Sequence, residues 1–306
     1  MATDPTSDGA MPLLPPGQAV ELAGRGTTWV CEGGDRNNPT LLLIHGWVAT
    51  APLNWFTTFE SLSEHYHVVA MDIRGHGKGI RTRLPFRLTD CADDAAALCE
   101  VLDIKAVTAV GYSMGGPICQ LLWDRHPELV EGLVMCATAG KFPNMRGPKL
   151  GNAYPVAMAL RLFGESAAMG LSFIPPGTMR ALARRLVRDR LHRTPLSEWS
   201  TDQRSYSDAA ALIRAGIELG RYDGTELLPR INVPTAVIET LQDTIVPIRR
   251  QERMAEAIPG ATAYPIDADH GACVENPRLF ARALLAACED VTTRAKAAAS
   301  PPAAGG

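Results

Sequence analysis

Short, continuous apolar runs alternate with helix-like segments along most of this chain. The apolar runs contain many β-branched residues and lack a polar residue at every second position, which is typical of strands buried on both faces of a parallel sheet. Their alternation with helices predicts an α/β fold with a mostly parallel, doubly wound sheet. The predicted strands are residues 41–44, 67–71, 107–110, 133–135, 235–238 and, with a weaker pattern, 261–266.

Helices are predicted between these strands. One should begin at Thr89 or Asp90 as its N-cap, because acidic residues follow in the first turns and an apolar face continues to Leu102. Two further helices are predicted near the end of the chain, over residues 248–258 and 277–288.

Residues 141–229 interrupt the alternation, because they contain helical patterns with no clear strand between them. We interpret this segment as a helical cap inserted between two parts of one core, residues 19–140 and 230–290. Its helical patterns cover residues 156–163, 179–188 and 208–217, and its basic residues outnumber its acidic ones. Solvated helix faces explain that excess, and so does a lid that favours an anionic acyl substrate or a lipid interface.

Both ends of the chain have a composition that favours disorder. Residues 1–18 are rich in Pro, Gly, Ser and Asp, and we expect a flexible arm there. The final segment ends in a run of Ala, Pro and Gly, and we expect residues 291–306 to form a disordered tail.

Composition narrows the class of protein. The 306 residues carry a formal net charge of −3, which gives no general attraction to nucleic acid or to an anionic membrane. No apolar run is long enough to span a membrane, and the first residues lack the basic and apolar regions of a secretory signal. The seven cysteines are odd in number and form no Cys-x-x-Cys, so we expect buried, reduced thiols and a cytoplasmic location.

The segment from Gly111 to Gly116 has the sequence Gly-Tyr-Ser-Met-Gly-Gly between a predicted strand and a predicted helix. A serine in such a turn can present its hydroxyl as a nucleophile. The turn leaves no room for side chains two residues before and two residues after the serine, and both positions are glycine. Ser113 is therefore the candidate nucleophile.

A serine nucleophile needs a base and an acid that orients the base. Among seven histidines, His270 is the candidate base because it directly follows the last predicted strand, where function resides in such sheets. Asp243 is the candidate acid, since it lies in the loop after the strand at 235–238. Asp267 and Asp269 are expected to organise their own loop instead.

Two backbone N–H groups are expected to form an oxyanion hole. Met114 supplies one at the start of a helix, where unpaired amides and the helix dipole favour negative charge. Trp47 supplies the other, from the loop His45-Gly46-Trp47 after an early strand. Trp47 and Tyr112 are also expected to contact the substrate, with Trp47 narrowing the acyl side of the pocket. His45 is expected to be structural.

The order Ser113, Asp243, His270 resembles that of the α/β-hydrolase superfamily. The loops His45-Gly46-Trp47 and Asp72-Ile-Arg-Gly-His-Gly77 also look like loops of that superfamily, and the resemblance covers residues 20–290. Within the superfamily, the chain looks most like the lid-bearing serine esterases and lipases of bacteria. The first loop departs from the multiple-glycine form of such loops. The cap, which sets the substrate in the family, matches no pattern for a known substrate.

The resemblance implies a serine hydrolase that cleaves a small-molecule carboxylic ester. The same triad could act on a thioester or a carbon–carbon bond, or catalyse perhydrolysis, and a binding protein of the same fold is a further alternative. Ser113 argues against the dehalogenase and epoxide hydrolase branches, which use an aspartate there. The sequence contains no metal-ligand spacing and no dinucleotide motif after a strand, so no metal or cofactor is expected.

Overall fold

The computed structural model describes residues 14–142, 177–178 and 195–299. In this part of the chain, eight strands form one sheet in the order β1-β2-β4-β3-β5-β6-β7-β8. The predicted doubly wound α/β architecture is confirmed, with strands β3 to β8 all parallel to one another. The strands are β1 (Gln18–Leu22), β2 (Gly26–Gly33), β3 (Thr40–Ile44), β4 (His67–Met71), β5 (Val107–Tyr112), β6 (Val130–Cys136), β7 (Thr235–Thr240) and β8 (Thr262–Ile266).

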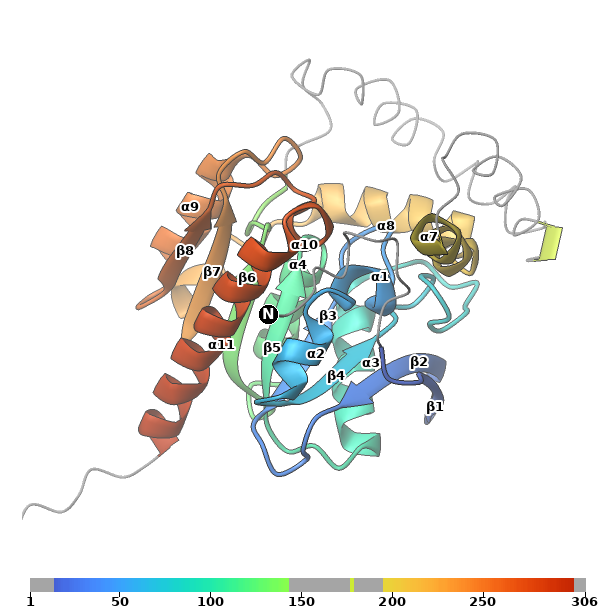
Figure 1. Cartoon of the computed structure of the whole chain (residues 1–306), viewed down its shortest axis with the longest axis horizontal. Coiled ribbons are helices and arrows are strands. Elements are labelled where there is room, and N and C mark those ends of the chain that lie inside the picture. Colours follow the sequence, from blue (N-terminus) through green and yellow to red (C-terminus); the bar gives the residue numbers. More distant parts are fainter. Residues whose placement is uncertain (1–13, 143–176, 179–194, 300–306) are drawn as a thin grey trace, which may run out of the picture.

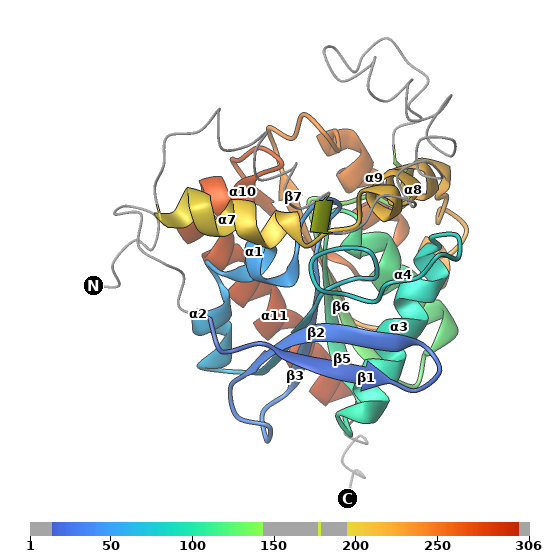
Figure 2. The same cartoon turned by 90° about the vertical axis from the view of Figure 1, so that its right-hand side faces the viewer.

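Helices cover both faces of the sheet (Figures 1 and 2). Alternate residues of β3 point to opposite faces of the sheet. Leu42 and Ile44 belong to the apolar cluster on one face, and Leu41 and Leu43 belong to the cluster on the other. The first cluster includes side chains of α3 (Leu88–Val101), α4 (Gly115–Arg125), α8 (Ala209–Arg221) and α9 (Ile248–Ala257). The second includes side chains of α1 (Ala51–Trp55), α2 (Phe59–Ser63), α10 (Ala272–Glu275) and α11 (Pro277–Ala299).

The first two strands were not predicted from the sequence. β1 and β2 form a hairpin, and β2 also pairs antiparallel with β4, which places the hairpin at one end of the sheet. β1 exposes three of its five residues, and β2 mixes buried with exposed positions. These strands therefore lack the continuous apolar run by which the central strands are recognised.

Two predictions about helices need correction. The helix predicted to be capped by Thr89 or Asp90 begins at Leu88, with Arg87 as its N-cap. The disordered tail predicted for 291–306 is wrong for residues 291–299, because α11 continues to Ala299. Val291 and Ala295 are buried, and the Arg294 guanidinium donates to the carbonyl of Thr235 at 2.9 Å. The alanine-rich composition suggested disorder, but the spacing of Val291 and Ala295 matches one buried helix face.

The described part of the cap lies over the carboxyl ends of the parallel strands (Figure 1). It consists of α7 (Pro195–Ser205) and α8, followed by a short 3₁₀ helix, η2 (Leu228–Arg230). α8 confirms the helical pattern expected at 208–217, and the Asp208 carboxylate caps it by accepting from the amides of Ala210 and Ala211. The patterns at 156–163 and 179–188 lie outside the described residues.

Hydrogen bonds attach α8 to the core at both of its ends. At its start, the Asp208 amide donates to the Gly75 carbonyl at 2.8 Å. Just beyond its end, the Gly224 amide donates to the Gly140 carbonyl at 2.7 Å, and Lys141 forms an ion pair with Asp223. This part of the cap is therefore fixed to the loops that follow β4 and β6.

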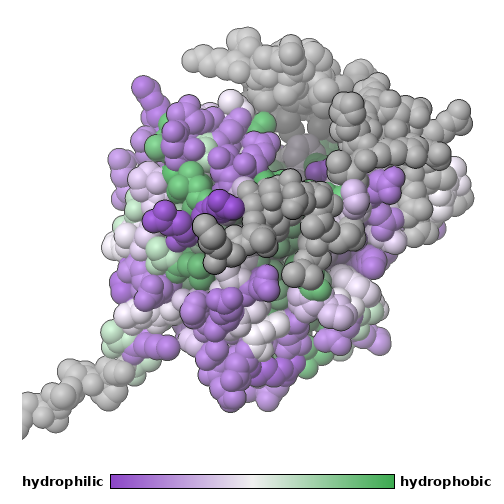
Figure 3. Space-filling view, in the orientation of Figure 1, coloured by the Kyte–Doolittle hydropathy of each residue, from purple (hydrophilic) through white to green (hydrophobic). Residues whose placement is uncertain are grey.

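On the face shown in Figure 3, the described residues are mostly hydrophilic, and apolar side chains appear as separate patches among polar ones. No helix in the described ranges has both the length and the apolar character needed to cross a membrane. The exposed large apolar side chains are Val48, Leu84, Val101, Leu241, Ile245, Val274 and Leu279.

A buried ion-pair network joins the hairpin, the loop after β4 and α3. The Asp94 carboxylate in α3 is 1% exposed and accepts two hydrogen bonds from Arg74, from Nε at 2.6 Å and from Nη2 at 2.7 Å. Arg25, in the turn between β1 and β2, adds a third from Nε at 2.6 Å. Because a buried charge is costly without its partner, the network depends on Asp94 remaining ionised and paired.

Replacing Asp94 by asparagine should therefore lower the free energy of unfolding by about 3–5 kcal/mol, because the buried Arg74 loses its main counter-charge and keeps only the more exposed Asp90, at 3.2 Å. Urea unfolding at pH 7 measures this loss. Asp93→Asn is the matched control. Asp93 is next in the same helix but pairs with the more exposed Arg125, so its replacement should cost less than about 1 kcal/mol. Equal losses in the two variants would contradict the assignment.

Candidate active site

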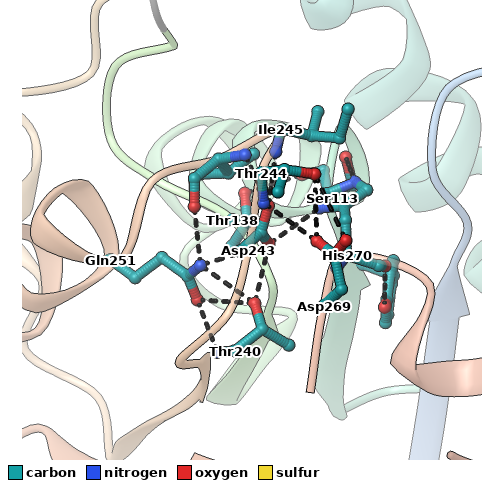
Figure 4. A network of polar contacts seen from close by, with 11 residues as sticks. Ser113, Thr138, Thr240, Asp243, Thr244, Ile245, Gln251, Asp269 and His270 are labelled. Atoms are coloured by element: carbon teal, nitrogen blue, oxygen red, sulfur yellow. Dashed lines mark hydrogen bonds and ion pairs between the residues drawn. The ribbon is translucent and has the colours of Figure 1, made fainter. Parts of the chain in front are cut away.

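Three side chains predicted from the sequence meet at the carboxyl ends of β5, β7 and β8 (Figure 4). The Nε2 atom of His270 lies 3.0 Å from Oγ of Ser113, and its Nδ1 atom lies 2.8 Å from Oδ2 of Asp243. These contacts join residues 157 and 27 positions apart in the sequence. A neutral imidazole protonated on Nδ1 can donate to the carboxylate while Nε2 accepts the serine proton, which is the arrangement of a nucleophile–base–acid triad.

The turn between β5 and α4 holds Ser113 in a left-handed backbone conformation, with φ of 50°. This conformation is rare for a residue with a side chain, and it directs the hydroxyl out of the turn. A Cβ atom on Gly111 would lie 2.4 Å from the carbonyl oxygen of Gly115, and one on Gly115 would lie 2.2 Å from that of Ile44. Both glycines are therefore required by the space available, as the sequence predicted.

Backbone groups around Ser113 fix the turn in place. The Ser113 amide donates to the carbonyl of Cys136, the last residue of β6, at 2.9 Å. The Ser113 carbonyl accepts from the Thr138 hydroxyl at 2.6 Å and from the Gly116 amide at 3.0 Å. The strained residue is therefore held by the segment that follows the neighbouring strand.

The side chain of Asp243 is completely buried, yet its carboxylate has many donors. Oδ1 accepts from the amides of Ile245 at 2.9 Å and Val246 at 2.6 Å. Oδ2 accepts from the hydroxyl of Thr240 at 2.7 Å and from Nε2 of Gln251 at 3.2 Å, in addition to His270. Donors on both oxygens compensate the loss of water and fix the plane of the carboxylate.

Neighbouring side chains position the loop that carries His270. Oδ1 of Asp269 accepts from the His270 amide at 2.7 Å and from the Thr244 amide at 2.9 Å, which ties this loop to the loop of Asp243. These hydrogen bonds lower the pKa of Asp269. Asp267 accepts from Gln242 at 3.0 Å. Asp267 and Asp269 thus organise loops, as expected. Of these three aspartates, Asp243 is the one whose carboxylate contacts the imidazole of His270.

The loop His45-Gly46-Trp47 lies against the serine. A Cβ atom on Gly46 would be 3.3 Å from Cβ of Ser113, and the Gly46 amide donates to the side chain of Asn54 at 3.0 Å. Within the described residues, the backbone amides of Trp47 and Met114 donate no hydrogen bond. Met114 directly precedes α4, so its amide lies at the positive end of the helix.

Comparison with known proteins agrees with this architecture. The family model described as "alpha/beta hydrolase fold" matches residues 39–277, which is more than half of the chain. The chain belongs to the α/β-hydrolase fold family.

Several proteins of this family are similar over most of their length. The chain is 27% identical over 257 residues to a proposed carbamate hydrolase, RutD, of Agrobacterium fabrum, covering 82% of this chain and 93% of that protein. It is 25% identical over 252 residues to 3-oxoadipate enol-lactonase 2 of Acinetobacter baylyi, covering 82% and 89%. A solved hydrolase from Pseudomonas aeruginosa superposes with a TM-score of 0.68 at 25% identity, covering 89% of this chain and 98% of that one.

The two residues expected to contact substrate have other contacts in this α/β hydrolase. The indole N–H of Trp47 donates to the Leu212 carbonyl of α8 at 2.8 Å, and a Cβ atom on Gly216 would lie 2.6 Å from the Trp47 ring. Tyr112 is buried, and its hydroxyl donates to the His270 carbonyl at 2.6 Å. Trp47 thus joins the loop after β3 to α8. The hydrogen bond from Tyr112 holds the loop of His270 in place, which favours a positioning role for Tyr112 over substrate contact.

Several supporting polar residues were not found from the sequence. Thr138, Thr240, Thr244 and Gln251 bond to the backbone or side chains of the triad loops. Single threonines and a glutamine on a helix carry no pattern of their own, so only the three-dimensional contacts identify them. The described residues contain no group of three or more His, Cys, Asp or Glu side chains that could hold a metal ion.

Buried titratable groups lie in and next to the loop His45-Gly46-Trp47. Nδ1 of His45 donates to the Gly46 carbonyl at 2.8 Å, and Nε2 accepts from the Ile73 amide at 2.9 Å. Burial lowers the pKa of His45 to about 3 and that of His76 to about 4. Asp72 accepts from the amides of Ala51 and Lys78, and burial raises its pKa to about 6. His45 is therefore a neutral structural residue, as predicted.

These shifts predict that the enzyme loses stability in mild acid. Between pH 6 and 4.5, His45 and His76 both carry a proton in the unfolded chain. In the folded protein, Asp72 is the one of these three groups that carries a proton. Unfolding thus takes up one net proton, and the free energy of unfolding should fall by about 1.4 kcal/mol for each unit by which the pH is lowered.

Urea unfolding of His76→Asn across this pH range tests the prediction, because removing one of the two histidines should cancel that slope. The exposed His65 provides the control variant, His65→Asn, which should retain the slope of the unsubstituted protein. An unchanged slope in His76→Asn would show that His76 accepts a proton in the folded state.

Proposed function

We propose that this α/β hydrolase is a serine hydrolase that cleaves a carboxylic ester through an acyl-enzyme intermediate. The observation that carries the proposal is the imidazole of His270, with Nε2 at 3.0 Å from Oγ of Ser113 and Nδ1 at 2.8 Å from Oδ2 of Asp243. A serine hydroxyl is a weak nucleophile, and a histidine base within hydrogen-bond distance is what activates it.

In the proposed acylation step, Oγ of Ser113 attacks the ester carbonyl as Nε2 of His270 accepts the hydroxyl proton. Asp243 remains ionised and stabilises the imidazolium. The amides of Trp47 and Met114 are proposed to donate to the tetrahedral oxyanion, since both lack another acceptor among the described residues. The imidazolium then protonates the leaving oxygen as the intermediate collapses and the ester C–O bond breaks, which releases the alcohol and leaves the acyl group on Oγ of Ser113.

Deacylation repeats these roles with water as the nucleophile. His270 accepts a proton from the water, which attacks the acyl-enzyme, and then returns a proton to Oγ of Ser113. The proposed chemistry suits open esters and lactones alike, because a lactone is a cyclic ester. Similarity to an enol-lactonase of Acinetobacter baylyi supports this reaction class.

Replacement of Ser113 by alanine should lower kcat for p-nitrophenyl acetate by about 10⁴- to 10⁶-fold, because no other hydroxyl of the described residues lies within hydrogen-bond distance of Nε2 of His270. Release of p-nitrophenol measures the rate, and circular dichroism verifies the fold. Ser63→Ala is the control, since Oγ of Ser63 donates only to the Phe59 carbonyl in α2. Ser113→Ala activity above a tenth of the parent's would exclude Ser113 as the nucleophile.

We also propose that Trp47 limits the acyl side of the pocket, since its ring occupies the space between the oxyanion loop and α8. A series of p-nitrophenyl esters from acetate to palmitate should show a shift toward longer acyl chains in Trp47→Ala. Trp47→Phe, which keeps an aromatic ring and loses the indole N–H, should retain the parent's preference. Identical chain-length profiles for all three proteins would contradict this role.

A further inference from the structure

Two polar side chains lie behind the acid of the triad, on the side away from His270 (Figure 4). Thr240 is the last residue of β7, and Gln251 lies in α9; both are fully buried. The Thr240 hydroxyl is 2.7 Å from Oδ2 of Asp243, and Nε2 of Gln251 is 3.2 Å from the same oxygen. Oδ2 is also the atom that accepts from His270.

Backbone groups determine the orientation of the Gln251 amide. Its Oε1 atom faces the backbone N–H of Thr240 at 3.0 Å, and its Nε2 atom faces the carbonyl of Val246 at 2.8 Å. A flipped amide would place donor against donor and acceptor against acceptor. Nε2 therefore has one remaining N–H, which is directed at the Thr240 hydroxyl at 2.9 Å and at Asp243.

The direction of the Thr240 hydroxyl follows from that orientation. The hydroxyl has one proton and two acceptors within reach, Oδ2 of Asp243 at 2.7 Å and Oε1 of Gln251 at 3.3 Å. The shorter bond to a charged acceptor is the stronger one. The hydroxyl therefore donates to Asp243 and accepts from Gln251. Donors from Gln251 through Thr240 on one side, and from Ser113 through His270 on the other, converge on Oδ2 of Asp243.

We propose that Thr240 and Gln251 are positioning residues for the triad, which hold Oδ2 of Asp243 against Nδ1 of His270 while the imidazole exchanges its proton. This inference rests on the proposed function for its kinetic part. With Oδ1 held by two backbone amides and Oδ2 by these two side chains, the carboxylate cannot rotate away from the imidazole. The imidazole then keeps its Nε2 atom directed at Oγ of Ser113.

Gln251 also forms hydrogen bonds with the backbone of Thr240 and Val246. Its replacement would therefore affect both the stability of the loop and the position of Asp243. Thr240 separates the two effects, because its hydroxyl serves only Asp243 and Gln251. The same strand also offers a matched control. Thr235 is equally buried at the start of β7, but its hydroxyl donates to the Val233 carbonyl at 3.0 Å, far along the strand from the triad.

The test compares Thr240→Val, Thr240→Ser and Thr235→Val by ester hydrolysis and thermal unfolding. Thr240→Val should lower kcat about 10- to 100-fold with KM unchanged, the effect of losing one hydrogen bond to a charged acceptor. Thr240→Ser restores the hydroxyl and should recover kcat to within about threefold of the parent. Thr235→Val should retain the parent's kcat even if it loses as much thermal stability as Thr240→Val.

A second readout needs no turnover. The proton between His270 Nδ1 and Asp243 should give a far-downfield NMR resonance, which Thr240→Val should shift and expose to faster exchange with water while Thr235→Val leaves it unchanged. Thr240→Val with the parent's kcat and resonance, or a loss of kcat that Thr240→Ser does not recover, would overturn the inference. A parent protein without esterase activity would overturn the proposed function alone, and the resonance would still decide the positioning role.

Discussion

The site depends on one backbone conformation, the left-handed turn at Ser113. This turn can form only where β5 ends between two parallel neighbours, because β6 supplies the acceptor for the Ser113 amide and β3 approaches so closely that Gly115 has no room for a side chain. The central strands therefore have a fixed order for a chemical reason. Placing them together also brings the loop after β3 so close to the serine that a Cβ atom on Gly46 would lie 3.3 Å from Cβ of Ser113.

A second principle recurs in the loops around that turn. Polar side chains hold these loops by accepting from their backbone amides. The buried Asp72 does this after both β3 and β4, the buried His45 after β4, and the buried Asp243 in its own loop, while the partly exposed Asp269 holds the loop of His270. The neutral His45 and the buried aspartates are therefore parts of the architecture of these loops.

Much of this arrangement could be predicted from the sequence, because strands buried on both faces are continuous apolar runs and each triad residue directly follows one. The hairpin of β1 and β2 could not, since its half-exposed strands lack such a run. The end of α11 was missed because alanine-rich composition concealed a helix face that packs on the sheet. Thr240 and Gln251 were missed for another reason: their role comes from contacts across 11 residues of chain, not from a motif.

The proposed function depends on the activation of Ser113 as a nucleophile by His270. The most direct measurement is peptide mass spectrometry after treatment with a fluorophosphonate, which reacts only with an activated serine. We predict one phosphonyl group per chain, attached to Ser113, and labelling slowed by several powers of ten in His270→Ala. A folded protein that remains unlabelled, or a label on another serine, would contradict the account.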